Sequence, residues 1–413
     1  MQERVILHCD CNSFFASVET ALNPAYKNVP MAVCGSESDR HGIVLAKNEL
    51  AKKYGIQTAE TVYSARKKCP ELVIAHPHYD AYAEYSRRVN EIYLRYTDMV
   101  EPFGIDESWL DVTASRKLFG TGEEIAERIR KEVREEIGIT VSIGVSFNKV
   151  FAKLGSDYKK PDAVTVIDST NVEKIVYPLP VFDLLFIGKK TAQQLNLLGI
   201  KTIGDLSIIP REVLVNQFGK IGDQLYKNSR GLDDSPVTKA GEREDQKSIG
   251  FGFTFRHDLV SKIDCKIAID YLADDVARRL RKADMLCSTV QLSIKDENLN
   301  VIQRQRMLDR ASDTCFDISS VAYNILADVW EDDKPIRMLT VTAQNLKKSE
   351  YFADQIDMFG KADDEKRAKD KKHDELIDKI KQKYGSESIT NGAILATDFG
   401  IKNNKVKKQT EGN

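Results

Sequence analysis

The spacing of apolar and polar residues changes repeatedly along the first part of the chain, and each spacing predicts an element. Arg4-Val5-Ile6-Leu7 is a short apolar run without a turn residue, which predicts a buried strand over residues 4–10. Apolar residues then recur at helical spacing until Asn23-Pro24 ends the predicted helix. Farther along, the pattern predicts an amphipathic helix over 79–96, a strand hairpin over 101–115, a charged helix over 122–137 and a strand over 140–147. Together these elements describe an α+β sheet domain, with residues 26–78 as a small mixed insert.

Residues 187–206, IGKKTAQQLNLLGIKTIGDL, have the pattern of two short helices joined by a tight turn. Gly188 opens the first helix, and Gly199 turns the chain into the second. The stretch resembles a helix-hairpin-helix, although Phe186 stands where that motif has its first glycine. Ordinary packing in a helical bundle fits the same pattern, so both interpretations stay open at this point.

A second α+β domain follows the polar segment Asp233 to Gln246. Its elements are predicted in the order strand, helix, strand, strand, helix, strand, over 248–256, 266–284, 288–295, 300–308, 314–330 and 337–345. This β-α-β-β-α-β order predicts a ferredoxin-like fold with both helices on one face of the sheet and the other face open. From about Ala362 the chain becomes a helix rich in Lys, Asp and Glu and then a polar tail, which we expect to be mobile.

The open face of this second sheet has a composition that suits nucleic acid. Alternation along KSIGFGFTFRHD turns the phenylalanines to one side, and the other side carries Ser248, Gly250, Gly252, Thr254 and Arg256. Further basic residues lie on the strands and their edges: Lys247, Lys295, Arg304, Arg306 and Arg337. Small residues beside arginine let a phosphate backbone approach closely. A half-exposed strand with an ordinary polar face would show the same alternation.

Length and composition fit a soluble, multidomain, cytoplasmic protein. The 413 residues exceed one ordinary core, and 42% hydrophobic and 30% charged residues are typical of soluble globular chains. No apolar run approaches the length that spans a membrane. Seven cysteines without CxxC spacing predict no disulfide framework. The formal net charge of −2 neither suggests nor excludes a polyanionic partner, so any basic surface must be local.

The stretch HCDC, residues 8–11, raises the question of a metal site. His8, Cys9 and Cys11 are possible ligands of zinc, but strand alternation puts both cysteines on one face and His8 and Asp10 on the other. No second Cys or His pair with zinc spacing follows. We therefore interpret the cysteines as small buried packing residues. Asp10 still needs an explanation, because a carboxylate in a buried strand is costly unless it is paired or binds a metal.

Asp106 and Glu107 are the carboxylates that could join Asp10. Adjacent strand residues point to opposite faces unless a bend brings them together, and Gly104 would permit that bend. If the bend meets the end of the first strand, three carboxylates converge into an all-oxygen site that suits Mg²⁺ and phosphate. Two such ions would form a clamp for in-line phosphoryl transfer. On composition alone, the same residues fit surface charges on a hairpin.

Three stretches together carry a family resemblance: DCNSFFASVE (10–19), GIDESWLDVT (104–113) and SIGVSFNKVFAKLGSDYKKPDAVTVI (142–167). They resemble, in order and spacing, the motifs of the bacterial Y-family or lesion-bypass DNA polymerases, which include the DNA polymerase IV and UmuC-type enzymes. The similarity extends over roughly residues 4–360. It implies a palm at 1–25 and 79–168, fingers at 26–78, a helical thumb at 169–235, a linker at 236–246, a little finger at 247–348 and a C-terminal tail at 349–413.

The resemblance implies roles for the carboxylates and for residues near them. Asp10 and Asp106 match the aspartates that bridge two Mg²⁺ ions, with Mn²⁺ as a possible substitute, and Glu107 matches the carboxylate near the primer 3′-hydroxyl. The backbone carbonyl of Cys11 would be a further ligand. Lys160 matches the lysine that contacts the incoming triphosphate, whereas Lys149 and Lys153 are expected to be solvated or to meet the DNA backbone.

The same resemblance places the nucleotide at the start of the first helix. The amides of Ser13, Phe14 and Phe15 would meet the triphosphate. Phe15 falls at the steric-gate position, where an aromatic ring excludes a ribose 2′-hydroxyl, and Phe14 is its packing neighbour. Many DNA polymerase IV enzymes carry Tyr and, three residues later, Arg on the fingers helix, where this chain has Glu49 and Lys52. Lys52 offers a point charge without the arginine fork, and Glu49 cannot bind a phosphate.

Contacts to DNA are implied for two regions, the thumb hairpin and the little finger. The residues concerned are Gly188, Lys189, Lys190, Lys247, Gly250, Gly252, Arg256, Arg304 and Arg306. QIDMF, residues 355–359, resembles the pentapeptide by which bacterial polymerases bind the sliding clamp. There Gln355 would enter a polar pocket, Met358 and Phe359 an apolar one, and Asp357 would lie between them.

The predicted function is template-directed, metal-dependent transfer of nucleotides from dNTPs to a primer, by a monomer in a bacterial cytoplasm. A nucleotide cyclase also uses a palm-like sheet and paired metals, but the thumb-like hairpin and the split βαβ domain argue against it. A non-catalytic DNA-binding subunit would have lost a metal carboxylate, and all three are present.

Overall fold

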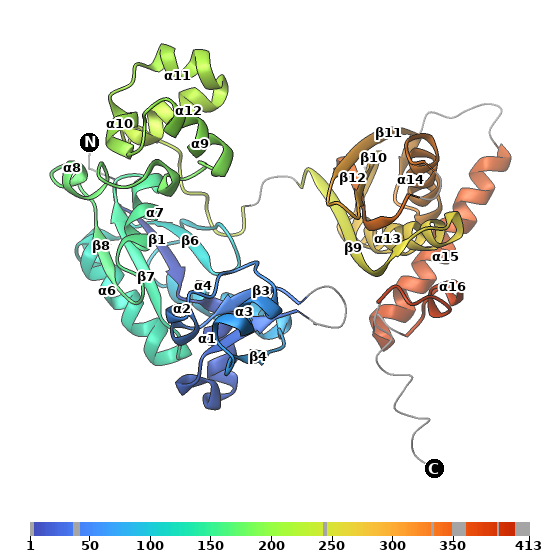
Figure 1. Ribbon diagram of the computed structural model, residues 1–413, viewed down its shortest axis with the longest axis horizontal. Helices are drawn as coiled ribbons and strands as arrows, with labels where there is room; N and C mark the ends of the chain where they lie inside the picture. Colours follow the sequence, from blue (N-terminus) through green and yellow to red (C-terminus); the bar gives the residue numbers. More distant parts are fainter. Residues whose placement is uncertain are drawn as a thin grey trace. The chain divides into compact units, whose positions relative to one another are not determined.

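The computed structural model describes residues 4–35, 42–242, 246–331, 334–348, 361–385 and 388–400. The chain divides near residue 243 into two compact units, labelled by element in Figure 1. Within the described residues, no helix is long and apolar enough to cross a membrane.

The first unit is built on a five-stranded sheet with the order β5-β6-β1-β7-β8. Its strands are β5 (Val100–Pro102), β6 (Glu107–Asp111), β1 (Ile6–Cys11), β7 (Val141–Ser146) and β8 (Val164–Val166). β1 lies at the centre, antiparallel to both β6 and β7, and all six of its residues are buried. The apolar run at the start of the chain is therefore the buried strand that its pattern predicts.

Helices cover both faces of this sheet. α4 (Tyr79–Tyr93) and α6 (Gly122–Glu132) pack on the face that carries Cys9 and Cys11. α6 continues as a π-helical turn, Val133–Ile137, so the helix predicted over 122–137 changes its hydrogen bonding in its last turns. α7 (Lys149–Tyr158) contacts β1, β7 and β8 on the opposite face.

Two glycines allow α7 to lie directly on the sheet. A Cβ built on Gly144 of β7 would come within 2.5 Å of the Ser156 nitrogen and closer still to the Ala152 carbonyl oxygen. A Cβ on Gly155 would lie 2.9 Å from the Gly144 Cα. Because both obstacles are backbone atoms, side chains at these positions would push the helix away from the strand.

The insert and the thumb complete the first unit. The insert, at the position predicted for the fingers, has a sheet of order β3-β2-β4 formed by β2 (Met31–Cys34), β3 (Val44–Lys47) and β4 (Val73–Ala75), with α2 (Glu49–Lys53) and α3 (Val62–Lys68). It follows α1 (Phe14–Leu22) and the 3₁₀ turn Pro24–Asn28. After the palm come α8 (Val172–Ile175), the turn Val181–Asp183, α9 (Lys189–Leu197), α10 (Ile203–Ser207), α11 (Arg211–Phe218) and α12 (Lys220–Ser229), while α5 (Arg116–Phe119) precedes α6.

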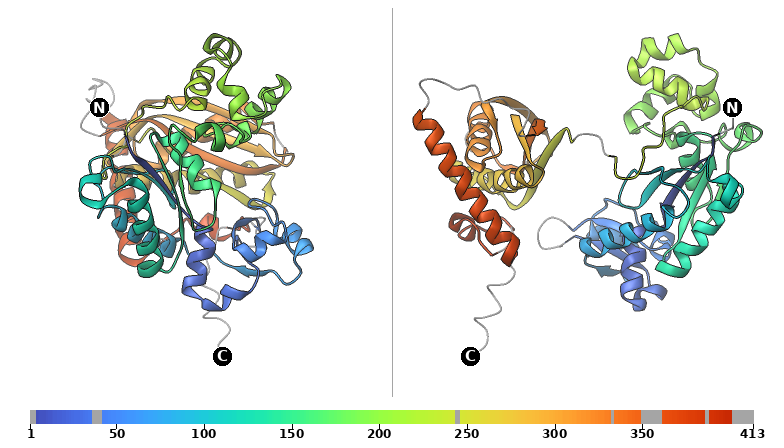
Figure 2. Two further views of the ribbon diagram at one scale, coloured as in Figure 1. Left: turned by 90° about the vertical axis from the view of Figure 1, so that its left-hand side faces the viewer. Right: turned by 180° about the vertical axis from the view of Figure 1, so that it is seen from behind.

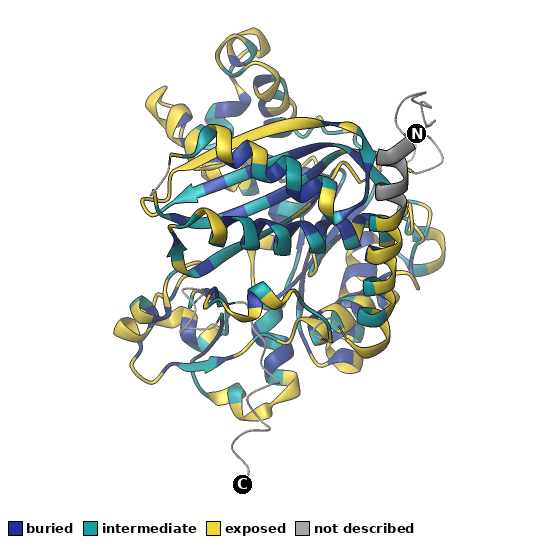
Figure 3. Cartoon of the chain, turned by 90° about the vertical axis from the view of Figure 1, so that its right-hand side faces the viewer, coloured by how far each residue is buried: buried dark blue, intermediate teal, exposed yellow. Residues whose placement is uncertain are grey.

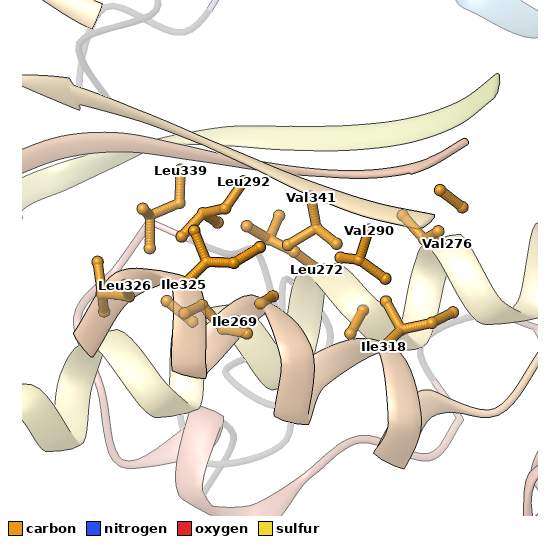
Figure 4. Packing of buried hydrophobic residues seen from close by; sticks show 14 of the residues in the cluster. Ile269, Leu272, Val276, Val290, Leu292, Ile318, Ile325, Leu326, Leu339 and Val341 are labelled. Carbon is orange, nitrogen blue, oxygen red and sulfur yellow. The ribbon is translucent and has the colours of Figure 1, made fainter. Parts of the chain in front are cut away.

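The second unit confirms the predicted β-α-β-β-α-β order. It contains β9 (Ser248–Leu259), α13 (Lys262–Lys282), β10 (Met285–Asp296), β11 (Val301–Ser312), α14 (Cys315–Val329) and β12 (Ile336–Lys348). The sheet order is β11-β10-β12-β9, all antiparallel. Leu292, Val341 and their strand neighbours point toward apolar residues of α13 and α14 (Figure 4). Along β10 and β12 buried residues alternate with partly exposed ones, so one face of the sheet is buried and the other is not, and residues 301–307 of the edge strand β11 are all exposed (Figure 3).

The charged helix expected from about Ala362 is confirmed, and its described part packs on the second unit. α15 (Lys361–Tyr384) runs beside α13 and α14, with the short α16 (Gly392–Leu395) next to it (Figures 1 and 2). Arg281 of α13, 8% exposed, contacts Asp374 and Asp378 of α15 at 3.1 and 2.7 Å. Phe399 is buried against Phe255. These partners lie far apart in sequence. The composition of the tail alone therefore suggests solvent exposure and does not reveal them.

Candidate functional site: three carboxylates at the end of β1

Asp10, Asp106 and Glu107 meet where β1 and β6 pair. Asp10 lies opposite Glu107 in the register, and directly opposite residues of antiparallel strands share a face of the sheet. Asp106 belongs to the bend before β6, and its carbonyl oxygen accepts a hydrogen bond from the Cys11 N–H at 3.0 Å. The Phe103 N–H donates to the Glu107 carbonyl at 2.9 Å and closes the bend. The three residues therefore lie at the same end of the β1–β6 pair.

The site holds two adjacent carboxylates in different electrostatic states. Burial, followed by the negative charges of Asp10 and Glu107, raises the pKa of Asp106 to about 6. Burial also acts to raise the pKa of Glu107, but contacts with His8 and Lys153 outweigh it and lower this pKa to about 2. Of these two carboxylates, Asp106 is therefore the one whose ionised form would be stabilised more by a further positive charge.

Two lysines from the region of α7 reach the carboxylates. Lys153 Nζ lies 2.7 Å from Glu107 Oε2 and 3.4 Å from Asp10 Oδ2. Lys160 Nζ lies 2.7 Å from Asp10 Oδ2, beside the carboxylates rather than in solvent. The expectation that Lys149 and Lys153 are solvated is wrong: Lys149 is buried and paired with Glu101 at 2.7 Å, and Lys153 is 16% exposed. The last turns of α7 face the sheet, because Gly144 and Gly155 let the helix approach.

A buried chain of contacts links Glu107 to α7 through His8, and the sequence reasoning missed it. His8 is fully buried; its Nε2 lies 3.2 Å from Glu107 Oε2 and its Nδ1 lies 2.8 Å from Ser156 Oγ. The Ser156 hydroxyl in turn donates to the Lys153 carbonyl at 2.8 Å. Strand alternation already put His8 on the face of Asp10, and that was the available signal.

The oxygen donors of this site fit a hard divalent cation. Three carboxylates and the nearby Cys11 backbone offer oxygen alone, as Mg²⁺ prefers. In this structure Asp10 and Glu107 are paired with lysines. Across the part of the chain that the structure describes, no three His, Cys, Asp or Glu side chains are grouped around one metal position. Burial raises the thiol pKa of both Cys9 and Cys11, on the opposite face, which agrees with packing rather than zinc ligation.

The start of α1 adjoins the carboxylates and carries the expected nucleotide-binding residues. Ser13 precedes α1 in a left-handed conformation, with φ 47°. Phe14 is buried, whereas Phe15 is partly exposed and stacks on Tyr82 with ring centroids 4.1 Å apart. Phe14 is therefore a packing residue, and Phe15 is the more exposed of the two rings. Lys52 and Glu49 lie on α2, near Ser13.

The thumb hairpin forms as the resemblance implied. Gly188 caps α9, Gly199 has φ 81° after it, and α10 follows. Phe186, at the motif's first glycine position, has φ 70° and is 64% exposed. It therefore adopts the left-handed backbone for which glycine is normally used. Lys189 and Lys190, in the first turn of α9, are exposed.

The register of the little-finger sheet places two of the residues expected to contact DNA away from its open face. Arg304 and Arg306 lie opposite Leu292 and Val290, whose side chains face the helices, so both arginines are on the helix side of β11. Arg306 indeed contacts Asp328 of α14. The open face instead carries residues that the composition did not single out, in register with Gly250 and Gly252: Thr340, Thr342, Gln291, Ser293, Gln303 and Gln305.

Arg256 and Lys247 flank this open face. Arg256 forms an ion pair with Asp398, at 2.5 Å, and its backbone N–H donates to the Phe399 carbonyl at 2.9 Å. Lys247 is exposed at the start of β9. The four residues expected to bind the clamp, Gln355, Asp357, Met358 and Phe359, lie outside the described residues.

Comparison with known proteins agrees with this architecture along nearly the whole chain. Residues 9–157 match the impB/mucB/samB family, residues 246–358 its C-terminal domain, and residues 183–233 the thumb domain described for DNA polymerase-iota. The chain is 45% identical to DNA polymerase IV of Acetivibrio thermocellus, covering 97% of this chain and 99% of that protein. It is 34% identical to DNA polymerase IV 1 of Bacillus subtilis, over 95% and 94% of the two chains. A solved Y-family DNA polymerase chimera superposes with a TM-score of 0.73 at 25% identity, covering 83% of this chain and 99% of that one.

The fold, the carboxylate cluster and the similarity to the solved polymerase place this chain in the class of Y-family polymerases. Within this class, the chain belongs to the impB/mucB/samB family, together with the relatives named DNA polymerase IV.

Proposed function

We infer that this protein is a template-directed DNA polymerase of the translesion type, which transfers nucleotides from dNTPs to a primer 3′-hydroxyl. The observation that carries this inference is the meeting of Asp10, Asp106 and Glu107 at the end of β1 in a Y-family fold. Phosphoryl transfer relies on positioning and on neutralising charge, and both are available here.

The chain's own residues would divide the work at this site. Asp10, Asp106, Glu107 and the Cys11 carbonyl would hold two Mg²⁺ ions, or Mn²⁺ in their place. Bound divalent ions would neutralise phosphate charge and favour ionisation of the primer hydroxyl. His8, whose Nδ1 contacts Ser156 and whose Nε2 lies 3.2 Å from Glu107 Oε2, would position Glu107. The amides of Ser13 to Phe15 together with Lys52 and Lys160 would bind the triphosphate, and Phe15 would exclude the 2′-hydroxyl.

DNA and a clamp are the proposed macromolecular partners. The thumb residues Gly188, Lys189 and Lys190 would contact the duplex backbone, and so would the open face around Gly250 and Gly252. QIDMF would bind the sliding clamp. Seven free cysteines and bacterial relatives support a cytoplasmic location.

Primer extension on a short primer-template with Mg²⁺ and all four dNTPs tests this function, comparing the wild type with Asp106→Ala and Glu107→Ala. We expect extension to be lost in both variants while their affinity for primer-template stays close to that of the wild type. Extension retained by either variant would overturn the metal assignment. A product formed without template would indicate a cyclase instead, and a folded, DNA-binding wild type that does not extend would indicate a non-catalytic subunit.

A further inference from the structure

Glu49 joins the fingers to the palm beside the proposed triphosphate site. Its Oε1 accepts a hydrogen bond from Ser13 Oγ of the palm at 3.1 Å and another from Lys52 Nζ of its own helix at 2.6 Å. A single carboxylate oxygen therefore contacts two residues of the expected triphosphate site, Ser13 and Lys52.

The position of Glu49 is fixed by the residue before it. Asn48 caps α2, where its Oδ1 accepts from the Ala51 N–H at 2.9 Å and from the Met31 N–H at 3.1 Å. Its Nδ2 donates to the Val29 carbonyl at 2.8 Å. The start of α2 is thus tied to the fingers sheet, and Glu49 projects from a defined backbone toward Ser13.

The surroundings of Glu49 are rich in positive charge. Burial and the charge of Lys52 lower the pKa of Lys47, whose Nζ lies 3.0 Å from Thr58 Oγ1. Lys160, the other lysine expected to meet the triphosphate, lies beside Asp10. These cations favour a polyanion, whereas the Glu49 carboxylate repels one.

The contacts of Glu49 can be exchanged at little cost. The side chains of Lys52 and Glu49 are 41% and 48% exposed, and exposed ion pairs contribute little to stability. A triphosphate can therefore take over Lys52 and the Ser13 region if the Glu49 contacts open. The carboxylate would then remain near the phosphates without its partners.

We propose that Glu49 is an affinity-setting residue of this polymerase: a palm–fingers latch that competes with the dNTP triphosphate for Lys52 and Ser13. This inference rests on the proposed function of the site. Removing the charge of Glu49 while retaining the shape of its side chain should let the triphosphate bind more tightly. This gain in affinity should depend on Lys52.

Equilibrium binding of a dNTP to the full chain on a primer-template with a dideoxy-terminated primer tests the latch, because that complex cannot react. Glu49→Gln is compared with Lys52→Met, the double variant and Glu123→Gln, an exposed carboxamide control on α6. We expect Glu49→Gln to bind roughly threefold to tenfold more tightly, and Lys52→Met to bind more weakly by a similar factor. The double variant should lose the gain of Glu49→Gln, and the control should match the wild type.

Steady-state extension supplies a second measurement on the same variants. A lower KM for dNTP with kcat within about twofold of the wild type supports the latch, since only nucleotide binding is altered. Weaker binding by Glu49→Gln would overturn the proposal and make Glu49 an aid to Lys52, and unchanged binding would overturn it as well. Failure of the wild type to bind a templated dNTP at all would instead refute the polymerase function.

Discussion

Replacing the two adjacent carboxylates, by Asp106→Asn and Glu107→Gln, is expected to change stability in opposite directions. Burial and neighbouring negative charge raise the pKa of Asp106 from 3.8 to about 6. The pKa of Glu107 falls from 4.5 to about 2, since contacts with His8 and Lys153 outweigh its burial. At neutral pH the folded chain therefore keeps Asp106 ionised at a cost, whereas ionised Glu107 is stabilising.

The magnitude follows from these pKa differences. One pKa unit corresponds to about 1.4 kcal/mol, which sets an upper limit of roughly 3 kcal/mol for either residue. Both side chains are partly exposed, and solvent screening reduces each effect to about 1–2 kcal/mol. The Asp106 penalty is absent below pH 3.8, grows as pH rises and is complete above about 6. The Glu107 contribution is complete above pH 4.5 and is lost as pH falls toward 2.

Urea unfolding at about pH 4 to 7, with a chelator of divalent metals present, measures both effects. Trp109 lies in β6 beside the carboxylates and is 4% exposed, so its fluorescence reports on the palm. A Trp330→Phe background removes the other tryptophan. Near pH 7, Asp106→Asn should be about 1–2 kcal/mol more stable than the wild type and Glu107→Gln less stable by a similar amount. The Asp106→Asn difference should vanish near pH 4, and a difference independent of pH, or shifts of both variants in one direction, would refute the assigned electrostatics.

Three further predictions concern the nucleotide, the fold and the clamp. Phe15→Val should raise incorporation of ribonucleotides by about tenfold or more, and unchanged discrimination in single-nucleotide extension would show that another residue forms the gate. Gly144→Ala should destabilise the first unit by about 3 kcal/mol or more, because its Cβ would meet the backbone of α7. Gly392→Ala, with open space around the added Cβ, serves as the control in the same unfolding measurement. Deletion of residues 355–359 should abolish stimulation by the sliding clamp with basal extension intact, and stimulation that survives would exclude QIDMF as the clamp ligand.

The elements of this fold follow from local sequence patterns. Strand alternation and helix spacing identified the order of the little finger, and the structure extends several of its elements by a few residues at their ends. β1, the bend before Glu107 and the exposure of Phe15 relative to Phe14 were also accessible, because each depends on neighbours in the chain or on the motif.

The errors arose where a side chain depends on distant partners. Lys153 resembles a solvated lysine on a short helix, until Gly144 brings that helix against β1 and Glu107. Arg304 and Arg306 share the composition of a DNA-binding edge, but pairing with β10 sets the register that puts both on the helix side of β11, where Arg306 contacts Asp328 of α14. The contacts of α15 were inaccessible for the same reason, since its ion pairs with Arg281 join residues 93 and 97 positions apart.

The small size of the fingers sheet has a consequence for motion. Its strands have 4, 4 and 3 residues, against 6 in the central palm strands β1 and β7, and its buried side chains include small ones such as Ala32 and Ala51. Local opening becomes easier as fewer backbone hydrogen bonds and apolar contacts must break. In amide hydrogen exchange, the fingers should therefore behave as a separate unit that exchanges before the palm. Glu49 and Lys52 can then reorganise around a nucleotide while β1 and β6, at the centre of the palm, keep the carboxylates in place.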